Sequence, residues 1–146
     1  MPTLIETETA AGEGRRPFAP PLVAAALLDW SNYLVLDSIQ DGTLPLAFDI
    51  ARPGACRQFL RVATASVLAA QAGLKASADL ERFFEATFPK SKPIYRAARL
   101  AWIWHCDYDH IYTLLTEGEL FDAGGATRYQ IPRESILTFL TKRRVK

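Results

Sequence analysis

The sequence predicts a mainly α-helical protein with small β-hairpins, an α+β fold, made of two similar halves that an amphipathic helix joins. Apolar residues recur at helical spacing in several short segments, and glycine and proline interrupt the chain at similar places in both halves. A shift of 76 residues places Gly42 on Gly118, and a shift of 69 places Ser66 on Ser135. Two diverged copies account for both shifts if the first copy carries an insertion after Leu44.

This repeat divides the chain into four predicted segments. The N-terminal residues are small and polar and show no apolar period, so we expect a flexible tail there. Between the copies, apolar residues spaced at i, i+3, i+4 and i+8 predict a helix with one apolar face, formed by Leu80, Phe83, Phe84 and Phe88. That face either seals the two copies together or forms a surface for a homodimer or another protein. The segments are the tail (1–19), the first copy (20–72), the linker helix (73–91) and the second copy (92–146).

Each copy is predicted to contain a helix, a tight turn, a second helix, a two-stranded hairpin and a third helix. Ser31 and Asp107 are suited to begin the second helix, because a side-chain oxygen can accept one of its unpaired amide protons. Gly42 and Gly118 are suited to end it, because glycine readily adopts a positive φ. The remaining expected elements are first helices at about 21–29 and 95–104, turns at 52–55 and 124–126, return strands at 59–62 and 128–131, and third helices from near Thr64 and Pro132.

That order of elements is the order of a winged helix-turn-helix, and two segments of the second copy carry a more specific likeness. Residues 111–120 (IYTLLTEGEL) and 129–140 (YQIPRESILTFL) resemble the excisionase-type DNA-binding domains of the mercury-resistance-regulator (MerR) superfamily. The first copy is similar only loosely, through residues 40–44 (QDGTL) and 60–63 (LRVA). The resemblance implies two tandem winged helix-turn-helix units that bind double-stranded DNA.

In a helix-turn-helix the second helix lies in the major groove, with its N-terminal residues near the base edges. The predicted base-reading residues are Tyr108, Asp109, His110 and Thr113 in the second copy, and Asn32, Tyr33 and Asp37 in the first. Asparagine can form two hydrogen bonds with adenine, and a carboxylate can accept one from cytosine. Asn32 is equally consistent with a helix-start residue held by local hydrogen bonds.

Phosphate contacts are expected from cations on the flanks of these helices. The resemblance implies that the wing arginines contact the DNA backbone. The candidates are Arg52, Arg57 and Arg61 in the first wing and Arg128 and Arg133 in the second. A basic C-terminal tail adds Lys142, Arg143, Arg144 and Lys146. The alternative interpretation of this tail is a solvated, frayed chain end.

The sequence departs from the family pattern in the second helix of each copy. The family commonly has an arginine after the tyrosine of that helix, where this chain has Thr113 and Asp37. Asp41, Asp109 and Glu117 repel phosphate if they face outward, which weakens the electrostatic part of DNA affinity. If one copy keeps the fold without contacting DNA, we expect it to be the first.

Charge distribution favours the same assignment, although the net charge is only +1. Residues 1–14 and 76–89 carry −3 and −2, whereas residues 15–75 and 90–146 carry +2 and +4. No apolar run is long enough to cross a membrane, and two cysteines make no disulfide framework, so a reduced cytoplasmic setting is expected.

Neither enzymatic activity, nor a metal site, nor a cofactor is expected. Cys56, Cys106 and the two histidines lack the ligand spacing of a zinc site. The three tryptophans are expected in the core or at an interface. Two alternatives to a small transcriptional regulator or recombination accessory stay open: a protein-interaction module on the same scaffold, and a small-terminase-like protein for DNA packaging.

Overall fold

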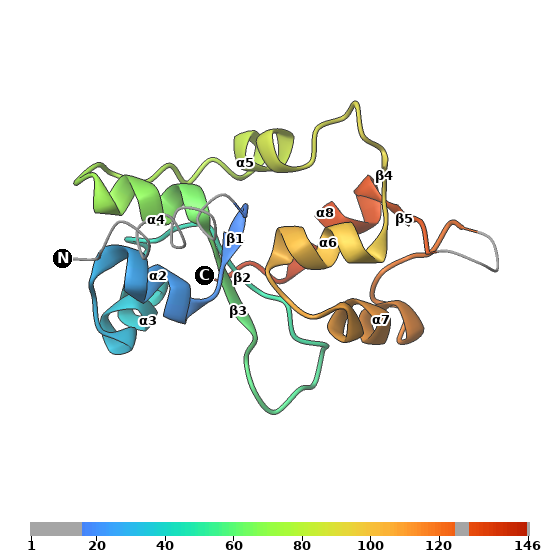
Figure 1. Ribbon diagram of the computed structural model, residues 1–146, viewed down its shortest axis with the longest axis horizontal. Helices are drawn as coiled ribbons and strands as arrows, with labels where there is room; N and C mark the ends of the chain where they lie inside the picture. The colour runs from blue at the N-terminus through green and yellow to red at the C-terminus, as the bar shows by residue number, and fades with distance from the viewer. Residues whose placement is uncertain (1–15, 125–128, 146) are drawn as a thin grey trace, which may run out of the picture.

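The computed structural model describes residues 16–124 and 129–145. Within them the chain forms seven helices and five short antiparallel strands, so the expected α+β class is confirmed (Figure 1). Among these residues no single helix is long and apolar enough to cross a membrane, and the bent pair α2 and α3 passes that test by length and composition only. The elements are β1 (Phe18–Ala19), α2 (Pro21–Leu28), α3 (Asn32–Asp41), β2 (Ala47–Asp49), β3 (Leu60–Ala63), α4 (Thr64–Gln71), α5 (Leu80–Thr87), β4 (Ile94–Tyr95), α6 (Ala97–Trp104), α7 (Tyr108–Thr116), β5 (Ile131–Pro132) and α8 (Arg133–Lys142).

In the first half, α2 and α3 meet at 105° across a turn of three residues. Pro21 begins α2, where its fixed φ and missing amide proton cost nothing. Asp29 ends α2 in the left-handed region, with φ at 54°. The Leu34 amide donates to the Ser31 hydroxyl at 3.1 Å, which confirms Ser31 as the cap of α3, and Gly42 ends that helix with φ at 87°.

The second half repeats this backbone geometry. His105 ends α6 with φ at 57°, and Gly118 follows α7 with φ at 78°. These two residues lie 76 positions after Asp29 and Gly42, which is the predicted shift. Asp107 occupies the predicted cap position of α7, but its side chain accepts no hydrogen bond from the helix, so that part of the prediction is wrong.

Strand pairing also repeats, and it adds an element that the sequence did not indicate. β1 pairs with β3 through Phe18 opposite Ala63, and β4 pairs with β5 through Ile94 opposite Pro132. The third helix of each half begins with the same bond, from the Thr64 amide to Pro17 and from the Arg133 amide to Pro93. A short strand therefore precedes each helix pair, so residues 18–19 belong to a buried sheet and not to a flexible tail; residues 1–15 lie outside the described part.

The hairpins of the two halves differ. In the first half, β2 and β3 form a ladder in which Ala47 lies opposite Val62. In the described part of the second half, β5 pairs with β4 instead of with the chain after Leu120, so the predicted second wing is not a two-stranded ladder. One backbone bond, from the Ala123 amide to the Gln130 carbonyl at 2.8 Å, closes that loop. We call residues 47–63 the first hairpin and residues 121–130 the second loop.

A carboxylate organises the base of both connections. Asp49 accepts the amide protons of Ala51 and Phe59, at 3.0 and 2.9 Å. Asp122 accepts those of Gly124 and Gln130, both at 2.9 Å. Each aspartate thus bonds the residue two positions ahead and the returning chain, because its short side chain reaches both amides.

The two halves share one aromatic core, which α5 completes. Phe83 and Phe84 lie on α5 and contact Phe18 and Phe48 of the first half, with ring centroids 5.4 and 6.2 Å apart. Phe88 is fully buried and contacts Tyr95 of the second half at 5.5 Å. In Figure 1, α5 runs above both halves. The predicted apolar face therefore seals the halves together, and it is not exposed to a second molecule.

The C-terminal residues add a further strand-like segment to the first half. The Asp49 amide donates to the Arg143 carbonyl at 2.9 Å, and the Val145 amide donates to the Ala47 carbonyl at 2.8 Å. Arg144 lies opposite Phe48 in an antiparallel bridge. Residues 143–145 therefore cover the outer edge of β2 instead of forming a solvated end.

Candidate nucleic-acid interface

Helix α7 lies between the first hairpin and the second loop (Figure 1). On one side the His110 ring stacks on Phe59 of the hairpin, with centroids 4.5 Å apart. Its Nε2 lies 2.5 Å from the Ile50 carbonyl oxygen, so this nitrogen carries the proton and donates it. Arg52 and Glu117 form an ion pair at 2.7 Å farther along the same side of the helix.

The opposite side of α7 faces the second loop through aromatic side chains. Tyr112 and Tyr129 meet edge to face, with centroids 5.9 Å apart. Partial desolvation, and after it the nearby Tyr112 phenol, raise the pKa of Tyr129 above its ordinary value. Between the two contacts, Tyr108 and Asp109, the first two residues of α7, are exposed. The N-terminal end of α7 is thus accessible, and chain segments from both halves flank it.

Positive charge on this surface comes from the first hairpin and not from α7. Neither α3 nor α7 contains a lysine or an arginine. Arg52 and Arg57 of the first hairpin line a hollow of about 410 Å³ together with His110 and Thr113. The structure therefore brings two predicted phosphate-binding residues beside two predicted base-reading residues, although they belong to different halves. Arg128 lies outside the described residues.

Arg61 is a predicted phosphate contact that the structure buries. Only 8 % of the residue is exposed, and its guanidinium donates to the Trp104 and His105 carbonyls at 2.9 and 2.7 Å. These carbonyls end α6 and have no partner within the helix. Burial lowers the pKa of Arg61 to about 10, so the group stays charged at neutral pH. Arg61 joins the two halves and does not face solvent, which corrects the sequence prediction.

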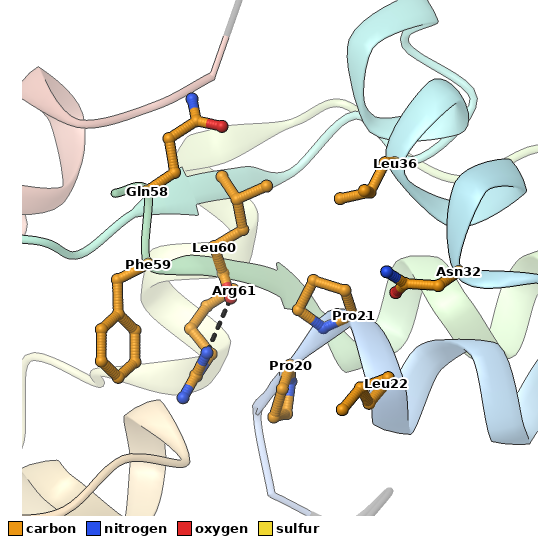
Figure 2. Close-up of a pocket in the computed structure, with 9 residues that line it drawn as sticks. All are labelled: Pro20, Pro21, Leu22, Asn32, Leu36, Gln58, Phe59, Leu60 and Arg61. Carbon is orange, nitrogen blue, oxygen red and sulfur yellow. Dashed lines mark hydrogen bonds between the residues drawn. The ribbon is translucent and has the colours of Figure 1, made fainter. Parts of the chain in front are cut away.

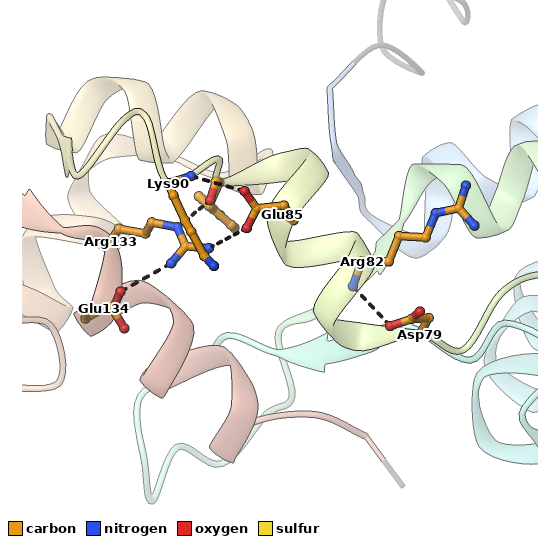
Figure 3. A network of polar contacts seen from close by, with 7 residues as sticks. Asp79, Arg82, Glu85, Lys90, Arg133 and Glu134 are labelled. Atoms are coloured by element: carbon orange, nitrogen blue, oxygen red, sulfur yellow. Dashed lines mark hydrogen bonds and ion pairs between the residues drawn. The ribbon is translucent and has the colours of Figure 1, made fainter.

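Arg133 is buried to the same extent, again against the prediction. Its Nε donates to the Phe88 carbonyl, and its terminal nitrogens lie 3.4 Å from Glu85 and 3.2 Å from Glu134 (Figure 3). The same Glu85 carboxylate accepts the Lys90 amide at 3.4 Å. This network fixes the end of α5 against the start of α8, which leaves Arg133 unavailable to a phosphate.

The predicted basic tail is also largely engaged. Arg143 donates to the Asp49 and Ala51 carbonyls at 2.9 and 3.1 Å, and it forms an ion pair with Asp49 at 3.4 Å. Arg144 donates to the Pro45 and Ala78 carbonyls, both at 3.3 Å. Lys142 is exposed, and Lys146 lies outside the described residues. Arg143 and Arg144 therefore hold the chain end in place.

The corresponding helix of the first half, α3, has a different environment. Asn32 lines an open groove of about 480 Å³ between the start of α2 and strand β3 (Figure 2). The groove is mainly apolar, with Pro21, Leu36 and Leu60 in its wall. Tyr33 is 82 % exposed and Asp37 is also exposed. Asp41 carries a negative charge at this end of α3, and hydrogen bonds from Thr43 lower its pKa, so it keeps that charge to a lower pH than a free aspartate.

Motif reasoning overlooked four cations that precede α7. Lys90, Lys92, Arg96 and Arg99 lie between Glu85 and Asp107, and the chain has no acidic residue in that interval. All four side chains are exposed. Counting charge in a sliding window, rather than matching a family motif, is the signal that reveals them.

The two cysteines differ in environment, and no three metal-binding side chains come together in the described part of the chain. Burial raises the pKa of the Cys106 thiol to about 12, whereas Cys56 is exposed on the first hairpin. A thiol-selective reagent at pH 8 should therefore modify Cys56 in the folded protein and both cysteines in denaturant, because the thiolate is the reactive form. Cys56→Ser should abolish labelling of the folded protein; comparable labelling of both native thiols would contradict the buried position of Cys106.

Comparisons of the chain with protein families, with curated proteins and with solved structures found no match.

Proposed function

We propose that this protein binds double-stranded DNA as a winged helix-turn-helix protein, with α7 in the major groove. The observation that carries the proposal is the position of α7: it follows α6 across a three-residue turn, and its exposed N-terminal end is flanked on both sides by loops. The equivalent pair in the first half crosses at 105°, within the range of about 90–120° typical of DNA-binding helix pairs. The first hairpin and the second loop act as wings on either side of the groove.

The second half is the DNA-reading half in this proposal. Tyr108 and Asp109 are exposed and available to base edges, and Thr113 is half-buried beside the hollow. His110 is held by the first hairpin and orients α7. Arg52 and Arg57 lie on the same side as His110 and contact the DNA backbone. The first half contributes its hairpin, while α3, with Asp37 and the negative Asp41 and no cation, stays off the DNA.

The test is a fluorescence-polarisation titration of a random-sequence duplex pool, repeated between about 50 and 200 mM salt. The log of the affinity falls with the log of the salt concentration, and removing two phosphate contacts makes that fall shallower by about 2. Arg52→Ala/Arg57→Ala is expected to show this shallower slope and about tenfold weaker binding at low salt. Lys75→Ala/Arg82→Ala removes the same charge from exposed residues away from α7 and should leave the slope close to that of the wild type. A wild-type protein that binds no duplex at the lowest salt would refute the proposal.

One observation favours protein binding as a second candidate function. Large apolar or aromatic side chains near α7 are exposed, including Tyr108 and Tyr112 at 46 % each and Phe121 at 63 %. Acidic residues accompany them, since Asp109 lies on α7 and Asp122 on the second loop. An aromatic surface with an acidic rim suits a basic partner. This candidate predicts no duplex binding at any salt concentration, so the same titration separates the two.

A further inference from the structure

In the proposed function α7 enters the groove, but it contains no lysine or arginine. Contacts to the DNA phosphates must therefore come from other elements. Arg52 and Arg57 supply one side only. Four exposed cations precede or begin α6: Lys90, Lys92, Arg96 and Arg99. We name these four residues the α6 basic patch.

The α6 basic patch has no acidic partner in the described part of the chain. Lys92 lies over the Tyr95 ring at 5.2 Å, and Arg99 lies over the Trp102 ring at 4.7 Å. A cation over an aromatic face keeps its charge and most of its hydrogen-bond donors, so both remain able to bind an anion. The aromatic rings hold these side chains in place without neutralising them.

The location of the patch is unfavourable for stability, which points to a role in binding. Arg96 is the residue immediately before α6, and Arg99 is in its first turn. The amide groups at a helix N-terminus already carry a partial positive charge, so cations there are repelled. Arg96 and Arg99 therefore add their charge to the positive end of the helix dipole, and Lys92 precedes Arg96 by four residues.

The strand pairing connects this patch to the proposed interface. Tyr95 of β4 lies opposite Ile131 of β5, the residue that directly follows the second loop, and Arg96 is the next residue after Tyr95. Helix α6 also packs directly on α7. In the helix-turn-helix arrangement the first helix crosses the DNA backbone next to the groove that holds the second. The start of α6 is thus where a phosphate strand would pass.

At the start of its first helix the first half has no counterpart of the two arginines. Positions 76 residues before Arg96 and Arg99 are Pro20 and Val23, which are uncharged, whereas the position equivalent to Lys92 is Arg16. Since α2 and α6 begin in the same way in the two halves, the backbone does not require arginine at these positions. The two arginines therefore distinguish the half that contains α7.

We infer that Lys90, Lys92, Arg96 and Arg99 form a phosphate-binding surface for the DNA backbone beside the groove that α7 occupies. The inference rests on the proposed function and supplies the cations that α7 lacks. Contacts of this kind strengthen binding to every sequence and set its salt dependence, but they do not select bases.

The test compares two double variants of the full-length chain in the polarisation assay described above. Arg96→Ala/Arg99→Ala is expected to make the slope of log affinity against log salt shallower by about 2 and to weaken binding to all duplex sequences alike. Arg96→Lys/Arg99→Lys should keep the slope, because the charges remain. Lys75→Ala/Arg82→Ala serves as the control of equal charge. The melting temperature of Arg96→Ala/Arg99→Ala should change little, since the substitution removes charges that the helix end repels together with the Arg99–Trp102 contact.

The possible outcomes separate the phosphate-binding role of the α6 basic patch from the proposed DNA binding by α7. If the wild type binds duplex, and Arg96→Ala/Arg99→Ala binds with an unchanged slope or loses no more than the control, the α6 basic patch is not a phosphate surface while the proposed function stands. If Arg52→Ala/Arg57→Ala and Arg96→Ala/Arg99→Ala each make the slope shallower, the phosphate surface and the proposed function are both supported. If the wild type binds no duplex at low salt, both are overturned.

Discussion

Replacing Arg61 with alanine is expected to lower the free energy of unfolding by about 3 kcal/mol and the melting temperature by about 10 °C. The Arg61 side chain bonds the Trp104 and His105 carbonyls and also the Leu60 carbonyl at 2.7 Å. Its loss leaves several buried or half-buried acceptors without a donor, and each such acceptor costs about 1–3 kcal/mol. Thermal unfolding followed by circular dichroism measures the effect.

The position of Arg61 explains why its loss should destabilise both halves. Its guanidinium lies 4.4 Å from the centre of the Phe59 ring, and the other contact of that ring is His110 of α7. Arg61 therefore supports α7 as well as the end of α6. Arg61→Lys keeps the charge but not the planar set of donors, so an intermediate loss is expected.

Arg57 offers a matched control because it is an exposed arginine of the same hairpin. Arg57→Ala should change the melting temperature by no more than a degree or two, since surface substitutions away from such contacts usually change stability by less than about 0.5 kcal/mol. An Arg61→Ala protein as stable as Arg57→Ala would show that the carbonyls at the end of α6 need no donor from the first half.

Replacing Phe88 with alanine is expected to cost about 3–5 kcal/mol, because the change removes a fully buried ring and leaves a cavity. Phe88 lies between the halves: its ring is 6.4 Å from Phe18 and 5.5 Å from Tyr95. Phe88→Leu preserves most of the volume and should cost less. Urea denaturation gives the free energy for each variant.

Phe121 provides the comparison for Phe88, since its side chain is 63 % exposed. Phe121→Ala should leave the urea midpoint nearly unchanged. Because the core is shared, Phe88→Ala should destabilise both halves in a single transition, visible with the same midpoint by fluorescence and by circular dichroism. Separate transitions for the two halves would contradict a shared core.

The repeat itself could be predicted from the sequence because its signals are local. Gly42 and Gly118 mark the same helix end in each half, and both have a positive φ in the structure. Ser31 could be assigned as a cap from its position alone, and its hydroxyl accepts the expected amide proton. Helices α2, α3, α6 and α7 are formed by periodic apolar residues near such signals, which depend on neighbours within a few positions.

The site residues were harder to predict because arginine is long and can bind either an external anion or an internal carbonyl. Arg52 and Arg61 belong to the same hairpin, yet Arg52 is exposed beside Glu117 whereas Arg61 is buried at the end of α6. Nothing in their immediate sequence separates them. The distinction depends on α6, which is more than 30 residues away along the chain.

The sequence by itself determined that this protein is an α+β repeat, with two helix pairs that end at glycines and an apolar helix between them. Only the tertiary structure decided how the halves combine: the hairpin of the first half packs on α7 of the second, α5 covers the joint core, and residues 143–145 return to β2. The physical reason is the separation along the chain over which each interaction acts. Helix periodicity and capping act between neighbours, whereas the partners of Arg61, Phe88 and Arg143 lie far away in sequence and are brought close only when the core is buried.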